Sequence, residues 1–252
     1  MTKTINLTLK VWRQDGPNAK GRFDTYHAEN ITTDMSFLEM LDVVNDQLTI
    51  DGKEPIAFDH DCREGICGTC GLMINGVPHG PLALTTACQI HMRHLKGATE
   101  VWIEPWRATA FPIIKDLVVD MDPFFEKHRY VRPYLINDEG VPEKERIQSA
   151  EEQEAIEPAL RCILCASCTS SCPISRANPN YLGPAALLRA FRYINDSRDT
   201  ATGGRLAQLD NDNGAWGCKT MWWCTDVCPK GIPVTKCIGQ IKRAIKQQAK
   251  NE

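Results

Sequence analysis

The stretch Arg161-Cys-Ile-Leu-Cys-Ala-Ser-Cys-Thr-Ser-Ser-Cys-Pro173 carries four cysteines. Their spacing, C-x2-C-x2-C-x3-C-P, is typical of a loop that wraps a [4Fe–4S] cluster. Three thiolates two residues apart on a curling loop converge on three corners of one cube. The fourth cysteine follows at the start of a helix and, in chains with two clusters, binds the other cluster. The stretch therefore predicts a second, reciprocal run of cysteines.

The reciprocal run is Cys218-Lys-Thr-Met-Trp-Trp-Cys-Thr-Asp-Val-Cys-Pro229, which fits the same template except at Met221. The crossing rule predicts four ligands for a [4Fe–4S] cluster, namely Cys162, Cys165, Cys168 and Cys228. Three thiolates remain for the second cluster, namely Cys172, Cys218 and Cys224. A thioether holds iron weakly at the fourth corner, so we predict a [3Fe–4S] cluster there. Two zinc sites are the alternative, although two crossed runs that both end in Cys-Pro favour clusters.

Length, charge and cysteine content set the broad class. A chain of 252 residues is long enough for two domains, and its net charge of −3 gives no sign of nucleic-acid binding. Twelve cysteines would suit a secreted disulfide scaffold behind an apolar leader, but the first ten residues alternate like a strand. Nor does any apolar run approach the ~18 residues of a membrane helix. We therefore expect reduced, cytosolic, metal-binding cysteines.

A second motif lies in the N-terminal half, Cys62-Arg-Glu-Gly-Ile-Cys-Gly-Thr-Cys70, with Cys88 farther along. The spacing C-x4-C-x2-C…C is the plant-type [2Fe–2S] pattern, and its predicted ligands are Cys62, Cys67, Cys70 and Cys88. Glycines within and after the motif allow the loop to bring backbone N–H groups close to sulfur. A four-cysteine zinc site is again the alternative.

The segments around this motif predict a β-grasp domain over residues 1–106. Alternating apolar residues predict strands at 5–11, 22–29 and 99–104. Asp34 or Ser36 can cap a helix that runs to about Leu48. Asn75-Gly76 predicts a tight hairpin turn between two further segments. The chain as a whole is predicted to be α+β.

Residues 107–252 are predicted to form an all-α, ferredoxin-like domain. Helices are expected at 113–129, after the Ser149 capping box, at 183–195 and at 234–248. In the first of these helices, three carboxylates are expected to point outward, namely Asp116, Asp120 and Asp122. The segments 131–144 and 203–213 are expected to be loops. Cys237, on the last helix, is predicted to be a buried thiol with no assigned role.

This order of domains resembles the iron–sulfur subunit of succinate dehydrogenase and quinol:fumarate reductase, respiratory complex II. The resemblance covers nearly the whole chain and includes Asp196-Ser-Arg-Asp-Thr200 and Cys228-Pro-Lys-Gly-Ile-Pro233. It implies that a flavoprotein subunit with covalent FAD docks on the N-terminal domain and oxidises succinate. Electrons would then pass singly through the [2Fe–2S], [4Fe–4S] and [3Fe–4S] clusters to quinone at a membrane anchor subunit, often haem-bearing. We expect a peripheral location on the cytoplasmic face of the bacterial inner membrane.

By position, the resemblance implies four quinone-facing residues, namely Pro173, Ala177, Lys219 and Met221. Many ubiquinone-using members carry tryptophans before an Asn-Pro, where this chain reads Ile174-Ser-Arg-Ala177. They also often carry a histidine in place of Lys219. We therefore expect menaquinone and a single di-haem anchor. A basic contact of Arg176 and Lys219 with the anchor or with lipid is an equal alternative.

Other hypotheses stay open at this point. The same clusters could run in reverse in a quinol:fumarate reductase. The chain could also be a soluble multi-cluster ferredoxin, although such carriers are typically smaller and more acidic. A third hypothesis is the cluster subunit of another flavin dehydrogenase or of a thiol:fumarate or heterodisulfide-type enzyme. Those relatives tend to carry an extra cysteine-rich C-terminal domain, which we do not expect beyond Glu252.

Overall fold

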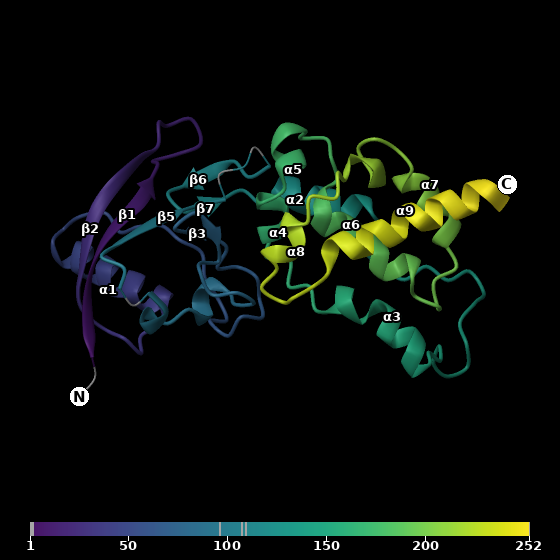
Figure 1. The fold of residues 1–252 in the computed structure, drawn as a ribbon, viewed down its shortest axis with the longest axis horizontal. Helices are drawn as coiled ribbons and strands as arrows, with labels where there is room; N and C mark the ends of the chain where they lie inside the picture. Colours follow the sequence, from purple (N-terminus) through teal and green to yellow (C-terminus); the bar gives the residue numbers. More distant parts are fainter. Residues whose placement is uncertain (1–2, 96, 107, 109, 252) are drawn as a thin grey trace.

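The computed structural model describes residues 3–95, 97–106, 108 and 110–251. The molecule is elongated, with a sheet at the N-terminal end and a group of helices at the C-terminal end (Figure 1). The predicted α+β class is confirmed. None of the helices in these described ranges is both long enough and apolar enough to cross a membrane.

The N-terminal sheet is mixed, and its strands follow the order β2-β1-β5-β3-β4. Their bounds are β1 Thr4–Arg13, β2 Arg22–Thr32, β3 Met73–Ile74, β4 Val77–Pro78 and β5 Glu100–Glu104. β1 pairs antiparallel with β2 and parallel with β5. The parallel pair requires a crossover, as the β-grasp prediction implied.

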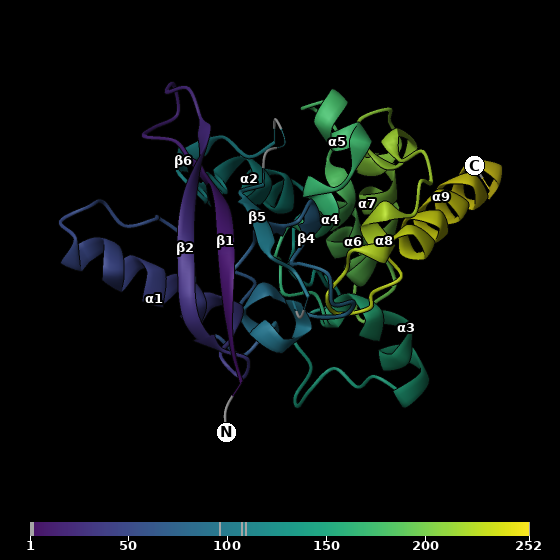
Figure 2. The same cartoon turned by 60° about the vertical axis from the view of Figure 1, so that its left-hand side comes forward.

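Helix α1 (Phe37–Ile50) crosses behind β1 and β2 (Figure 2). Ser36 begins it with a capping box, because its hydroxyl accepts from the Glu39 N–H while the Glu39 carboxylate accepts from the Ser36 N–H. Alternate residues of β1, Leu7, Leu9 and Val11, are buried against the helix side of the core. Two short 3-10 helices follow, η1 (Ala87–Gln89) and η2 (Met92–Leu95).

The helix predicted over residues 113–129 is wrong in its first half. A hairpin of β6 (Ile113–Lys115) and β7 (Val118–Val119) occupies that half, and α2 (Asp122–Tyr130) begins later. Asp116 is completely buried in the hairpin turn, where its carboxylate accepts from Arg13 Nε at 2.9 Å and from the Ala57 N–H at 3.0 Å. The spacing of the acidic residues resembled the exposed face of a helix. Instead, Asp116 forms a buried ion pair with Arg13 of β1, and the segment around it is a β-hairpin.

The hairpin also bears on the division into domains. Its Asp116 N–H donates to the Gln14 carbonyl and its Leu117 N–H donates to the Ala57 carbonyl, so it packs on the N-terminal half. The boundary after Trp106 remains a proposal, and residue 107 itself lies outside the described residues.

The C-terminal half is helical from α2 onward in the described residues. After α2 come α3 Ala150–Leu160, α4 Ser167–Ser170, α5 Pro173–Ala177, α6 Gly183–Ile194, α7 Thr202–Leu209, η3 Ala215–Gly217, α8 Trp223–Asp226 and α9 Val234–Asn251. α6 packs against α9, which turns Ile238, Ile241 and Ile245 inward as predicted. Ser149 caps α3 as predicted. Segment 131–144 contains no helix or strand, also as predicted.

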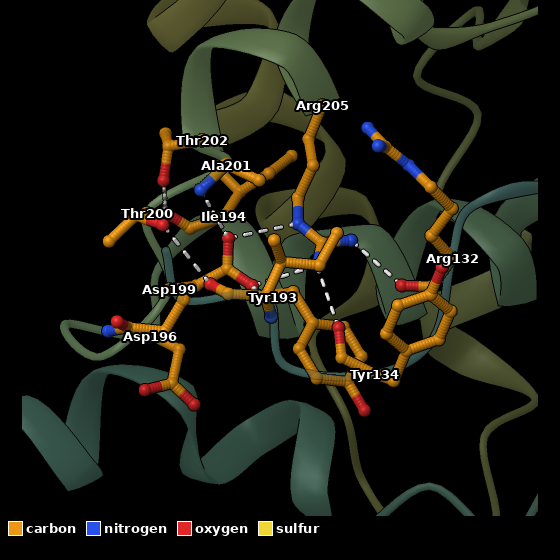
Figure 3. Close-up of polar contacts among 12 residues, drawn as sticks. Arg132, Tyr134, Tyr193, Ile194, Asp196, Asp199, Thr200, Ala201, Thr202 and Arg205 are labelled. Carbon is orange, nitrogen blue, oxygen red and sulfur yellow. Dashed lines mark hydrogen bonds and ion pairs between the residues drawn. The ribbon is translucent and has the colours of Figure 1, made fainter. Parts of the chain in front are cut away.

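The loop predicted at 203–213 is wrong, because α7 occupies most of it. Arg205 of α7 is buried. Its guanidinium donates two hydrogen bonds to the Asp199 carboxylate, from Nε at 3.1 Å and from Nη2 at 2.8 Å (Figure 3). The remaining N–H groups donate to the carbonyls of Val131, Arg132 and Tyr134. All the N–H donors of the buried Arg205 guanidinium thus have acceptors. The polar sequence of α7 gives no sign of these contacts, because their acceptors are distant in the sequence.

Asp116→Ala tests the buried ion pair. The substitution removes the buried carboxylate bonded to Arg13 and leaves only the exposed carboxylate of Glu54, 3.9 Å away, so we expect the free energy of unfolding to fall by about 3–5 kcal/mol. Urea denaturation followed by tryptophan fluorescence measures the change. Asp46→Ala, exposed on α1, is the matched control and should change stability by at most ~0.5 kcal/mol. Equal urea midpoints for the two variants would contradict the role of Asp116.

Arg205→Lys tests the anchor of segment 131–138. Lysine keeps the charge but cannot form the bidentate pair with Asp199 while serving three carbonyls. We expect amide exchange at Ile136 and Thr200, whose N–H groups bond Asp199 and the Ile136 carbonyl, to accelerate about tenfold or more. Hydrogen exchange with mass spectrometry measures this, with exposed Arg243→Lys on α9 as control. Unchanged exchange in Arg205→Lys would show that the guanidinium geometry is dispensable.

Candidate iron–sulfur centres

One cavity brings together cysteines from both C-terminal runs. Cys162 lies just after α3, Cys165 and Cys168 lie in the loop and in α4, and Cys228 follows α8. All four line a single cavity, together with apolar residues such as Ile232 and Val234. The fourth cysteine of this set therefore comes from the second run, which is the crossing that the spacing predicted.

A second cavity holds the remaining three thiols of the two runs. Cys172, the residue before α5, lines it together with Cys218 and Cys224. Met221 lines the same cavity, and its side chain is half exposed. No fourth thiol is among the lining residues, so the donor set fits a cluster with three thiolate ligands rather than four.

The two runs form the same backbone loop, offset by 56 residues. Leu164 and Ala166 have φ of 57° and 65°, and their counterparts Thr220 and Trp222 have φ of 58° and 65°. A four-residue helix follows in each run, α4 in the first run and α8 in the second. The backbone hydrogen bonds at the start of α4 have exact counterparts at the start of α8. Met221 therefore occupies the position of Cys165 in an otherwise retained cluster loop.

In the N-terminal centre, η1 carries Cys88 to the loop of Cys62, Cys67 and Cys70. Gly65 has a φ of +74°, and a Cβ there would lie 3.0 Å from Thr86 Oγ1, so the loop rests directly on the residue before η1. Gln89 Nε2 also donates to the Arg63 carbonyl at 2.6 Å. The thiol of Cys70 donates a hydrogen bond to the sulfur of Cys88, which lowers the pKa of Cys88 to about 5 and raises the pKa of Cys70.

The surroundings of the sulfurs fit metal-bound thiolates. Backbone N–H groups approach Cys62, Cys67 and Cys218 within 3.3 to 3.4 Å. Each of the three centres also has at least one hydroxyl beside a sulfur: Thr86 at Cys88, Ser167 at Cys165 and Thr235 at Cys224. Such donors stabilise negative charge on sulfur and help to set cluster potentials. All twelve cysteines are described, and none is in a disulfide.

Burial sets the protonation of the inner thiols. It raises the pKa of Cys165 to about 11 and the pKa of Cys168 well above its ordinary value. Backbone hydrogen bonds from Glu64 and Ile66 instead lower the pKa of Cys62 to about 7. Because metal ligands are thiolates, a cluster bound in the cavity of Cys165 and Cys168 would displace protons from these buried thiols. Among the described residues, no three Cys, His, Asp or Glu side chains are grouped to hold a single metal ion.

The [2Fe–2S] motif touches the first C-terminal loop directly. Gly68, between Cys67 and Cys70, has a φ of +78°, and a Cβ there would lie 2.2 Å from the Ile163 carbonyl oxygen. Cys67 and Cys165 line one cavity at this seam. Ala166 packs in the same apolar cluster as Trp106. Only glycine allows the two cysteine-bearing loops to come this close.

The residues predicted to face quinone are brought together only in part. Pro173, Lys219 and Met221 line the cavity of Cys172, whereas Ala177 is exposed at the end of α5 and is not among the lining residues. The structure adds Trp222 and Trp223 to that lining, which the sequence analysis did not single out. Their position between two ligand cysteines was the available signal. Cys237 is buried on α9, and burial raises its pKa to about 11.

Comparison with known proteins gives the same two-part organisation. A 2Fe-2S iron–sulfur cluster binding domain matches residues 8–126, and a 4Fe-4S dicluster domain matches residues 158–232. A chain of the Mycobacterium smegmatis Sdh1 complex in the apo form superposes with a TM-score of 0.84 at 25% identity, covering 98% of both chains.

Curated relatives match over nearly the full length. A succinate dehydrogenase iron–sulfur subunit from Paracoccus denitrificans is 38% identical over 96% of this chain and 88% of its own. A fumarate reductase iron–sulfur subunit from Escherichia coli is 33% identical over 96% of this chain and 94% of its own. The chain therefore belongs to the family of succinate dehydrogenase and fumarate reductase iron–sulfur subunits.

Proposed function

We propose that this chain is the electron-transfer subunit of a membrane-bound succinate:quinone oxidoreductase, carrying electrons one at a time from a flavoprotein subunit towards quinone. The observation that carries the proposal is the crossing of the two C-terminal runs. Cys228 lines the cavity of Cys162, and Cys172 lines the cavity of Cys218 and Cys224. Such an exchange of cysteines is the arrangement of two neighbouring clusters in one chain.

The proposed ligands follow the donor sets described above. Those of the [2Fe–2S] cluster are Cys62, Cys67, Cys70 and Cys88. Those of the [4Fe–4S] cluster are Cys162, Cys165, Cys168 and Cys228, and those of the [3Fe–4S] cluster are Cys172, Cys218 and Cys224. Bound there, the clusters supply one-electron redox chemistry, which suits a link between a two-electron flavin and a quinone.

The protein provides a surface for electron entry at the N-terminal motif. Cys62 and Cys67 are half-buried, and Ile66 between them is 60% exposed. Arg63 fixes this loop on α1 through a bidentate pair with Asp42, at 2.6 and 3.1 Å. An apolar tip on a rigidly held loop is suited to a protein partner, and we propose that the FAD-bearing subunit covers it.

The repeated loops support an exit surface at the other end. In the first run, Ala166 and Ser167 are 2% and 1% exposed, and Ala166 packs in the apolar cluster of Trp106. In the second run the equivalent residues are Trp222 and Trp223, each 51% exposed. The first loop is thus covered by another part of the same chain, around Trp106. We propose that the second meets a membrane anchor subunit, because tryptophan favours the boundary between membrane and water.

Finer features of the complex are part of the same proposal. Pro173, Lys219 and Met221 would face the quinone, with Trp222 and Trp223 beside them, and Ala177 at the margin. We propose menaquinone as the quinone, a di-haem anchor, and a peripheral position on the cytoplasmic face of the bacterial inner membrane. The lysine that follows Cys218 and the sequence Ile-Ser-Arg-Ala before Asn178 support menaquinone, because they depart from the pattern of ubiquinone-using members.

Low-temperature EPR of native membranes tests the proposed function. Air-oxidised membranes should show a three-iron signal that disappears on addition of succinate while a [2Fe–2S] signal develops. A three-iron signal indifferent to both succinate and fumarate would keep the clusters but contradict the complex II function, and would favour a multi-cluster ferredoxin. Absence of any iron signal would favour zinc.

Met221→Cys tests why the second cluster has three irons. A thiol at the position equivalent to Cys165 supplies the missing ligand, so we expect the three-iron signal to fall by more than about half and a second [4Fe–4S] signal to appear. EPR of oxidised and reduced samples measures both signals. Met221→Leu keeps an apolar side chain without sulfur and should retain the three-iron signal. An undiminished signal in Met221→Cys would contradict this account.

Replacing Trp222 and Trp223 together by serine tests the exit surface. Loss of two exposed aromatic anchors should reduce succinate-dependent quinone reduction about tenfold or more. Reduction of a soluble dye that accepts electrons at the flavoprotein should stay unchanged. Trp102→Ser, at an exposed position of β5, is the control. Undiminished quinone reduction in the double variant, or an equal loss with the dye, would contradict an exit surface here.

A further inference from the structure

His79 is a buried histidine that the proposed electron path does not use. It follows β4, is 1% exposed and has a φ of +61°, in the left-handed region that few residues with a Cβ adopt. Its backbone N–H donates to the Leu72 carbonyl at 2.9 Å, which ties it to the segment just after Cys70. A bulky polar residue held in such a conformation calls for a local reason.

The imidazole supplies an acceptor to the helix that carries Cys88. Nδ1 accepts a hydrogen bond from the N–H of Ala87, the first residue of η1, at 3.3 Å. The first N–H groups of a helix have no partner within it. Thr86, the residue before η1, makes no capping hydrogen bond through its side chain; its hydroxyl lies 3.3 Å from the sulfur of Cys88 instead.

The protonation of His79 is fixed by this contact. Because Nδ1 accepts, the proton of the neutral ring is on Nε2, and that atom is buried without a hydrogen-bond partner. Burial also lowers the pKa of His79 to about 4, so the ring stays a neutral acceptor at ordinary pH. A buried donor without a partner, here Nε2–H, is unfavourable for folding. The hydrogen bond that Nδ1 accepts from Ala87 is a reason for a histidine at this position despite that cost.

The same ring reaches the segment that carries Cys70. It stands edge-on to Trp106, with centroids 5.6 Å apart and planes at 87°. Trp106 in turn presses on Gly71, where a Cβ would lie 2.5 Å from its Nε1. His79 therefore lies between the supports of Cys70 and Cys88, the two buried thiols of the N-terminal set.

We propose that His79 is a positioning residue for the [2Fe–2S] centre: it holds the start of η1 so that the Thr86 hydroxyl donates to the sulfur of Cys88. The role rests on the proposed ligand set. Loss of a donor at a ligand sulfur destabilises the more negative, reduced cluster, so disturbing this arrangement lowers the midpoint potential.

Three variants in the intact complex test the role, with EPR-monitored redox titration as the readout. His79→Leu keeps apolar bulk but removes the acceptor. His79→Asn places an acceptor at the position of Nδ1 and tolerates positive φ. Thr86→Val removes the hydroxyl directly and gives the full effect for comparison. Exposed His27→Leu on β2 is the control.

We expect His79→Leu to lower the [2Fe–2S] midpoint potential in the same direction as Thr86→Val, and to alter the shape of its EPR signal. His79→Asn and His27→Leu should match the wild type, and the three-iron signal should not change in any variant. If His79→Leu fails to assemble, His79→Asn decides: a wild-type potential supports the role, and a shift as large as that of Thr86→Val overturns it.

Two other outcomes are also decisive. A wild-type potential and spectrum in His79→Leu would overturn the role of His79 while leaving the proposed ligands intact. A wild-type complex with no [2Fe–2S] signal at all would instead overturn the proposed function, on which this inference rests.

Discussion

The exchange of one cysteine between two loops is the constraint on which the C-terminal half depends. Cys172 and Cys228 each end one run and line the cavity of the other. The loops must therefore lie back to back, with α4 and α8 in contact, before either donor set is complete. The long helices serve this arrangement, because α6 and α9 form the apolar core against which both loops rest. A ligand pattern, rather than helix propensity, thus determines how short helices of four or five residues are placed.

The contact between the two halves is equally specific. Gly68 meets the backbone at Ile163 and Cys165, so the loops of two different motifs touch without an intervening side chain. Asp116 and Arg13 lock the hairpin β6–β7 onto the N-terminal sheet, and the apolar cluster of Trp106, Phe111 and Phe124 continues from there to Ala166. Close contact between the cysteine-bearing loops suits a carrier of single electrons. These contacts hold the three sets of thiols at fixed positions relative to one another.

The sequence predicted the parts of this design that depend on local spacing. The cysteine motifs, the caps at Ser36 and Ser149 and the alternation in β1 were readable because each pattern repeats within a few residues. Asp116, Arg205 and His79 were not readable in the same way. Their partners are Arg13, the carbonyls of 131–134 and the N–H of Ala87, so their roles exist only after the chain has folded. Trp222 and Trp223 needed the superposition of one loop on the other, which spacing alone does not give.

The crossed cysteines also impose an order on biosynthesis. The four cysteines of the N-terminal set have all been translated once the ribosome has passed Cys88. The set that begins at Cys162 has no fourth thiol until Cys228 has been translated, and the set of Cys218 and Cys224 needs Cys172 from the earlier run. Neither of the two C-terminal sets of thiols can therefore be complete before both runs have been translated.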